Sequence, residues 1–161
     1  MGKYSSNLFT LNTFYSSIKR TIKGNTPSDS TLSFLCKYWN CVASNIIQWN
    51  ELNKKEISKV DLRENYIVTQ GVVIQAIGQV GSYFINNSEI NMYEILKGLR
   101  NIDWRRSASI WKNRVIRADG KILTSNKAIL LASNQIKKEL GIPLLPDEEL
   151  KEKRYLESLT I

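Results

Sequence analysis

The sequence predicts an all-α fold, an irregular array of about six helices in one domain over residues 1–161. Three observations support this. Apolar residues recur at intervals of three and four along most of the 161-residue chain, which is the helical period. Stretches that alternate between apolar and polar residues are no longer than a few residues, so residues 121–123 would pair only briefly. Helix caps and glycine or proline stops fall between the periodic segments.

The first two expected helices cover residues 11–23 and 31–45. Thr10 is placed to cap the first of them, and Gly24 is placed to end it. The apolar stripe expected on the second helix is Leu32, Leu35, Trp39, Val42 and Ile46. Residues 51–59 are polar and rich in lysine, so we expect an exposed helix end or a loop there.

A third helix is expected to begin at Ser58 and to continue through Tyr66 towards Thr69. The apolar segment 72–85 predicts a buried helix whose inner stripe is Val73, Ile77, Val80 and Phe84. Within it, Gly78 and Gly81 each lower helix propensity by about 1 kcal/mol relative to alanine. We therefore expect another helix to pack closely against these two structural glycines.

The remaining helices are expected at residues 90–99, 126–140 and from Pro146 onwards. Asp119–Gly120 indicates a turn, and either Thr124 or Ser125 is placed to cap the helix that follows. Pro146 and the acids after it are typical of a helix start. Because this last helix is highly charged, residues 147–161 are interpreted as a loosely attached terminal helix.

The strongest functional signal is the run of residues 102–121, called here the basic segment. It contains six basic and two acidic residues, so it carries +4 of the chain's formal net charge of +8. The expected phosphate contacts are Arg105, Arg106, Lys112, Arg114, Arg117 and Lys121, with Thr124, Ser125 and Lys127 added by the start of the next helix. Trp104 and Trp111 lie between these cations, as is typical of nucleic-acid surfaces.

Two alternatives remain open for the basic segment. Arginine stems often cover apolar surface, and one or more of these arginines would then tie a loop to carboxylates such as Asp103. Tryptophan is also more often a core residue than a base-stacking residue.

The composition excludes several kinds of site. The chain has no histidine, which removes Ser-His-Asp and Cys-His catalysis and the common histidine-containing zinc sites. Cys36 and Cys41 would point to different faces of a helix, so we expect two reduced thiols. We therefore expect no catalytic residue, no metal and no cofactor, and we interpret the chain as a non-enzyme. With no signal peptide and no apolar run of membrane-spanning length, we expect a cytoplasmic protein.

Three stretches resemble a known family: SSNLFTLNTFY at 5–15, DLRENYIVTQGVVIQAIGQVG at 61–81, and the block 102–149 that opens with IDWRR and closes with LGIPLLPDEE. Their order and spacing are similar to those of DndB, the DNA sulfur modification protein of the DGQHR-domain family. The DGQHR motif itself does not occur. The resemblance is therefore to the C-terminal helical part of such proteins, and functions tied to the DGQHR part cannot be carried over.

This resemblance implies a bacterial setting of DNA phosphorothioate modification. It implies DNA binding and transcriptional repression of the modification operon, and not the sulfur transfer itself. The alternative is an interaction or dimerisation module that docks a DGQHR-type domain, a second copy or another modification-system protein. The block that contains Trp104 and Trp111 matches best, so we interpret both tryptophans as structural anchors that position the arginines.

Overall fold

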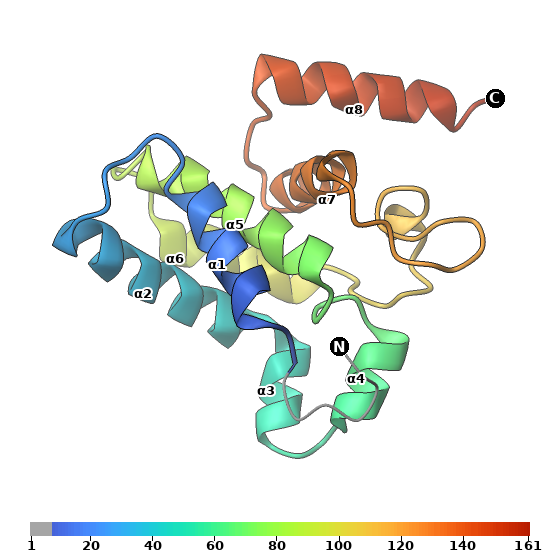
Figure 1. Ribbon diagram of the computed structural model, residues 1–161, viewed down its shortest axis with the longest axis horizontal. Coiled ribbons are helices and arrows are strands. Elements are labelled where there is room, and N and C mark those ends of the chain that lie inside the picture. Colours follow the sequence, from blue (N-terminus) through green and yellow to red (C-terminus); the bar gives the residue numbers. More distant parts are fainter. Residues whose placement is uncertain (1–7) are drawn as a thin grey trace.

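The computed structural model describes residues 8–161, and this part of the chain contains eight α-helices and two short 3-10 helices but no strand (Figure 1). The predicted all-α class is therefore confirmed, with more helices than the six or so expected. The resemblance at residues 5–7, and the expectation that the chain start is not a signal peptide, fall wholly or partly outside the described residues.

The helices are joined by turns and irregular loops, the longest of which precedes α7. Their bounds are α1 Leu11–Thr21, α2 Asp29–Asn45, α3 Ile47–Asn53, α4 Lys59–Asn65, α5 Gly71–Ile85, α6 Met92–Leu96, η1 Lys97–Asn101, η2 Ser109–Trp111, α7 Asn126–Glu139 and α8 Pro146–Ser158.

The apolar helix α5 is the centre of the fold, with α1 and α7 as its main packing partners. Its expected inner stripe of Val73, Ile77, Val80 and Phe84 is buried. Because α5 is apolar on most of its surface, it needs cover on several sides, which α1, α2 and α7 provide. Figure 1 shows α1 crossing in front of α5, and α7 lying between α5 and α8.

Gly78 and Gly81 of α5 allow α1 and α2 to approach closely, as the sequence predicted. A Cβ atom on Gly78 would lie only 2.8 Å from the backbone carbonyl carbon of Ser17 on α1. A Cβ atom on Gly81 would lie 2.7 Å from Cε1 of Tyr38 and 2.9 Å from Cγ2 of Thr21. The Thr21 hydroxyl also donates a hydrogen bond of 2.7 Å to the Gly78 carbonyl. These contacts fix the position of α1 on α5.

Several helix ends form where the sequence places a cap. The side chains of Thr10, Ser58 and Ser125 accept hydrogen bonds from backbone N–H groups in the first turns of α1, α4 and α7. Of the two candidates at α7, the cap is therefore Ser125. Gly120 has a φ of 81°, which explains why the turn after Asp119 uses glycine.

Two expectations about the N-terminal half are corrected, and one further helix is present. Residues 47–53 form α3, an additional helix that has no side-chain cap and no buried residue. The third expected helix ends at Asn65, because the backbone becomes extended at Tyr66 and the N–H of Ile67 bonds to the Trp104 carbonyl at 3.0 Å. Leu32 is 61% exposed, whereas Val42 and Ile46 of the expected stripe are buried together with Tyr38, which the stripe did not include.

The helix expected over residues 90–99 is divided into α6 and the 3-10 helix η1. Met92, Leu96 and Leu99 are buried as expected. None of the helices in residues 8–161 combines the length and the hydropathy that crossing a bilayer requires.

The C-terminal helix α8 is fastened to α7 by buried charged groups. Lys137 of α7 bonds both carboxylate oxygens of Glu148 at 2.9 Å, and both side chains are buried. Asn134 donates to the carbonyl of Glu148 and to a carboxylate oxygen of Glu152, each at 3.2 Å. The interpretation of residues 147–161 as a loosely attached helix did not anticipate these contacts.

Candidate nucleic-acid interface

The basic segment is built on its two tryptophans. Trp104 and Trp111 are 2% and 0% exposed, and their rings stack with centroids 5.5 Å apart and an interplanar angle of 10°. Each indole N–H has a backbone acceptor: Trp104 donates to Leu99 and Trp111 donates to Asp103. Both rings are buried in the core, so neither is available to stack on a base.

Backbone hydrogen bonds tie this irregular segment to the rest of the fold. The N–H of Arg106 donates to the carbonyl of Asn65 at 2.8 Å, and the N–H of Leu123 donates to Val115 at 2.7 Å. Ile116 forms an isolated bridge with Ile122, the brief pairing that the sequence allows. The segment is therefore ordered without being helical, and the direction of each cation is set by this framework.

The structure corrects the expectation that Arg114 contacts phosphate, because its side chain is buried and has a structural role. The residue is 3% exposed. Its guanidinium makes two hydrogen bonds to the Glu152 carboxylate, one of them 2.8 Å long, and a third to the Leu131 carbonyl at 3.0 Å. It also lies 4.2 Å from the ring centroid of Tyr155. Through these contacts the Arg114 side chain joins the basic segment to α7 and α8.

The charge of Glu152 follows from this environment. Burial alone would raise its pKa, but hydrogen bonds and charge from Arg114, with further bonds from Asn134 and Lys138, hold the pKa below its ordinary value. Burial also raises the pKa of the adjacent Tyr155 hydroxyl. The Glu152 carboxylate is therefore held in its charged form at neutral pH.

Two further arginines of the basic segment are exposed but already have acidic neighbours. Arg105 pairs with Asp103 at 2.6 Å and Arg117 pairs with Asp119 at 2.8 Å. The hydrogen bond from Arg105 lowers the pKa of Asp103, and the same contact raises the pKa of Arg105. The alternative that these arginines order the loop is therefore supported for both, although both guanidiniums remain open to solvent.

The other predicted phosphate contacts differ in their solvent exposure and in whether they already have a partner. Arg106 is half-buried and donates to the Arg63 carbonyl at 3.2 Å. Lys112, Lys121 and Lys127 are exposed, and within residues 8–161 none of them has an ion-pair partner. Thr124 is exposed just before the α7 cap residue Ser125. Of these, only Lys127 belongs to the cavity described next.

A second cationic surface lies in a cavity of about 1120 Å³, called here the basic groove. Four helices, α1, α5, α7 and α8, supply most of its lining, so residues far apart in the sequence meet there. The basic side chains that line it are Lys19, Arg20, Lys23, Lys127, Lys151 and Arg154. The acidic side chains that line it are Asp147 and Glu148. Both acids are already paired, Asp147 with Lys151 and Glu148 with Lys137.

Sequence reasoning missed most of this groove. Lys19, Arg20 and Lys23 lie in or just after the last turn of α1, where cations are commonly explained by the helix dipole. One signal in the sequence could have indicated the groove. These cations recur on one side of an amphipathic helix, and the apolar side of that helix packs on α5. Nothing local in the sequence indicates that Lys151 and Arg154 of α8 would face them.

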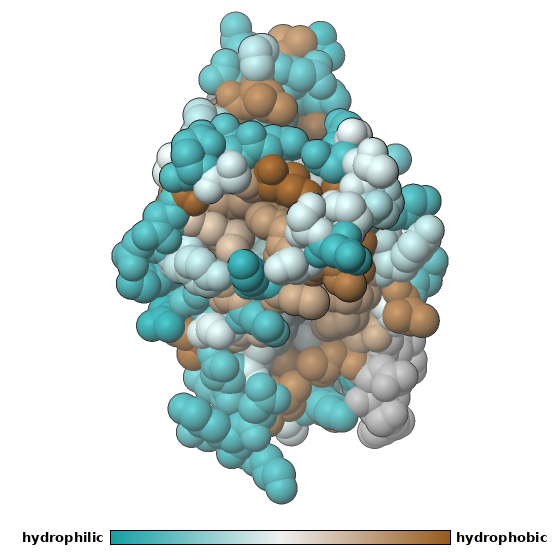
Figure 2. Space-filling model, turned by 90° about the vertical axis from the view of Figure 1, so that its left-hand side faces the viewer, coloured by the Kyte–Doolittle hydropathy of each residue, from teal (hydrophilic) through white to brown (hydrophobic). Residues whose placement is uncertain are grey.

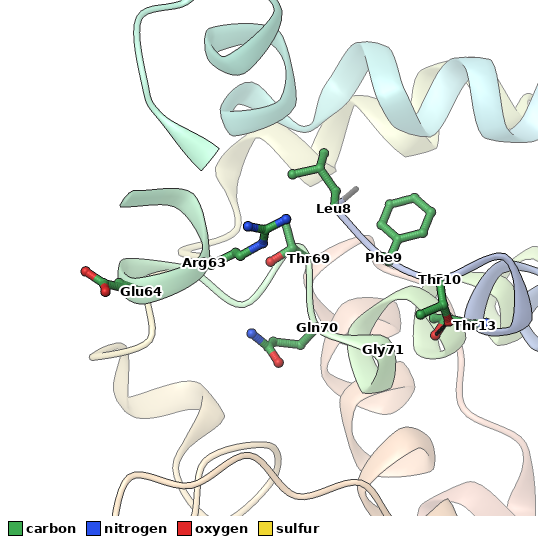
Figure 3. Close-up of a pocket in the computed structure, with 9 residues that line it drawn as sticks. All are labelled: Leu8, Phe9, Thr10, Thr13, Arg63, Glu64, Thr69, Gln70 and Gly71. Atoms are coloured by element: carbon green, nitrogen blue, oxygen red, sulfur yellow. Dashed lines mark hydrogen bonds between the residues drawn. The ribbon is translucent and has the colours of Figure 1, made fainter. Parts of the chain in front are cut away.

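A smaller cavity of about 450 Å³ lies between the start of α1, the end of α4 and the start of α5 (Figure 3). In Figure 3 the Arg63 side chain extends towards Thr69 and Leu8, whereas Glu64 points away. Because Leu8 is the first residue that the structure describes, we assign no ligand to this cavity. No group of three or more Cys, Asp or Glu side chains suited to a metal ion occurs in the described residues.

Comparison with known proteins gives one match. The family model for DndB, described as DNA-sulfur modification-associated, matches residues 1–143 of the chain. Neither the curated proteins nor the solved structures contain a match.

Proposed function

The chain belongs to the DndB family of DNA-sulfur modification-associated proteins, and from this premise we propose that it is a DNA-binding domain. In this role it would act in, or assist, a regulator that represses transcription of the modification operon. Membership supports involvement in DNA sulfur modification, and the cationic surfaces support contact with the DNA backbone. No catalytic role is proposed, because the sites described above contain no nucleophile and base in contact.

The observation that carries this proposal is the charge of the basic groove. Five of its six cations, Lys19, Arg20, Lys23, Lys127 and Arg154, have no ion-pair partner within residues 8–161. Cations without acidic partners attract phosphate and release the counterions condensed on DNA. A groove lined from several helices also concentrates the positive potential more than a flat surface does.

The proposal is tested by a salt titration of DNA binding with this chain. We expect binding that weakens steeply as salt rises, with a log–log slope that reports the number of phosphates contacted. An operator duplex and a scrambled duplex of equal length should be compared, because phosphate contacts bind both and only base contacts separate them. Absence of measurable binding to either duplex at low salt would contradict the proposal.

A second candidate function, docking of a protein partner, is favoured by hydrophobic side chains exposed on and beside α8. Leu145 is 61% exposed, and Leu150, Leu156 and Leu159 are 46–47% exposed. Figure 2 shows hydrophobic side chains among hydrophilic ones at the upper end, where α8 lies, and in a hollow below it. Light scattering of the chain alone and mixed with a DGQHR-type domain would detect self-association or a stable complex.

A further inference from the structure

Arg20 is held in a fixed orientation by three side-chain amides. Its Nε donates to Oε1 of Gln75 at 3.1 Å, its Nη1 to Oε1 of Gln79 at 3.4 Å, and its Nη2 to Oδ1 of Asn126 at 2.9 Å. Gln75 and Gln79 lie one turn apart on α5, and Asn126 is the first residue of α7. Because α1 and α7 both pack on α5, the guanidinium lies where the three helices meet.

Among the residues that the structure describes, the charge of this guanidinium has no counter-ion. All three acceptors are neutral amides, and no carboxylate within residues 8–161 forms an ion pair with Arg20. The residue is half-buried, and this burial lowers its pKa. A partly desolvated cation without a carboxylate differs from Arg114, whose charge Glu152 neutralises. An anion that binds in the adjoining space stabilises such a cation.

The free donors of Arg20 suit an oxyanion. A guanidinium has five N–H donors in a planar fork, and three are used, which leaves two. The neighbouring Lys19, Lys23 and Lys127 add positive charge to the same cavity. The first backbone N–H groups of the 14-residue helix α7 begin beside Asn126, and their partial positive charge favours the same ligand.

The size of the cavity points to a polymer of phosphates. At about 1120 Å³ the groove is much larger than one phosphate group, and its cations are spread over α1, α7 and α8. A DNA strand offers one negative charge per nucleotide and would place successive phosphates along such a lining.

We propose that Arg20 fixes one backbone phosphate of DNA in the basic groove, and that Gln75, Gln79 and Asn126 are positioning residues for it. This inference rests on the proposed DNA-binding function and adds to it the residue and the surface that make the central contact. Lysine cannot replace Arg20 fully, because a point charge on a flexible stem cannot use the three amides and the phosphate together.

The test compares Arg20→Gln and Arg20→Lys in salt titrations with a duplex oligonucleotide. We expect Arg20→Gln to weaken binding about tenfold and to reduce the salt slope by about 0.9, the value for one phosphate contact. Arg20→Lys should retain most of the slope but lose affinity. The matched control is Arg100→Gln, because Arg100 also donates to an amide, Asn45, at 2.7 Å but does not line the groove.

A further variant keeps Arg20 in place and gives it a counter-ion. Gln75→Glu has nearly the same shape and would pair with the guanidinium, so we expect a loss of affinity similar to that of Arg20→Gln without loss of the fold. Asn40→Asp, an exposed change of equal charge on α2, is its control. Thermal unfolding of each variant identifies any change that is due to folding alone.

The outcomes separate the two proposals. If the unaltered chain binds no duplex, the proposed function fails. If the unaltered chain binds, but Arg20→Gln and Gln75→Glu match their controls, the proposed function stands and the assignment of Arg20 is overturned.

Discussion

The basic segment and the basic groove have the same formal charge but use it differently. The basic segment carries six cations and two acids within twenty consecutive residues. The groove is also lined by six cations and two acids, but they come from α1 and the turn after it, α7 and α8. In the segment, Arg105 and Arg117 pair with acids two residues away, and Arg114 is buried against Glu152. In the groove, five cations remain without such partners in the described residues.

The difference shows that charge density along a sequence and charge available at a surface are separate quantities. Arginines that are close in sequence to aspartates in a tight loop find them as partners, and their charge then stabilises the loop. Cations that meet only after folding have no such local partners. The following substitutions test whether the basic segment has mainly a structural role and the basic groove mainly a binding role.

The largest expected effect is that of Arg114→Gln on stability. The substitution leaves the Glu152 carboxylate buried with only Lys138 and Asn134 as partners, and breaking a buried ion pair from one side costs about 3–5 kcal/mol. Urea denaturation measures this change. In the exposed pair with Asp119, Arg117→Gln should cost less than about 1 kcal/mol. Equal effects of the two substitutions would remove the distinction between a buried and an exposed arginine.

Gly78→Ala should destabilise the fold and the groove together. The added methyl group meets the Ser17 backbone, and overpacking of this kind costs about 1–3 kcal/mol. Because α1 carries Lys19 and Arg20 and is followed directly by Lys23, its displacement should also weaken DNA binding in the fraction that remains folded. Thermal unfolding and DNA titration on the same sample measure both effects. Gly24→Ala, at an exposed turn with a φ of 76°, serves as a control that strains the backbone without moving α1 on α5.

Acid should weaken the attachment of α8. The folded-state pKa of Glu152 is below its ordinary value of 4.5, so its contribution to stability is complete above that value. The contribution is lost as the pH falls through the lower folded-state pKa. Urea midpoints measured between pH 7 and pH 3 should therefore fall at the acidic end. In Glu152→Gln this component of the fall should be absent, and an unchanged pH profile would contradict the assignment.

The smallest effect concerns the exposed pair of Arg105 and Asp103. Removal of the guanidinium in Arg105→Gln should raise the pKa of Asp103 towards its ordinary value, because the hydrogen bond from Arg105 is the main cause of its lowered pKa. NMR titration of the carboxyl group measures the shift. The urea midpoint should stay close to that of the unaltered chain. A large loss of stability would show that this exposed pair also has a structural role.

The features that the sequence predicted correctly are those encoded by nearby residues. The caps at Thr10, Ser58 and Ser125 are local patterns, and the close approach at Gly78 follows from two glycines in an otherwise apolar helix. The interpretation of the two tryptophans as structural anchors rests on their place in the best-matching block, and both side chains are buried. Helix α3 was missed because its N-cap is Ile46, which offers no capping side chain.

The features that the sequence could not predict depend on distant partners. Glu152 lies 38 positions from Arg114, so the burial of that arginine had no local signal. The amides that hold Arg20 lie 55, 59 and 106 positions away. In the sequence, a cation at the end of an amphipathic helix is equally consistent with a solvent-exposed side chain. Only the packing of α1, α5 and α7 shows that Arg20 is half-buried and bonded to three amides.

The most direct test of this division removes two charges from each region and compares DNA binding. Lys19→Gln/Lys23→Gln represents the groove and Lys112→Gln/Lys121→Gln represents the basic segment, and all four lysines are exposed. We expect the groove variant to lose more affinity and to reduce the salt slope by up to about 1.8, which corresponds to two phosphates. The segment variant should change the slope by less than half as much. A larger loss in the segment variant would contradict the assignment of binding to the groove.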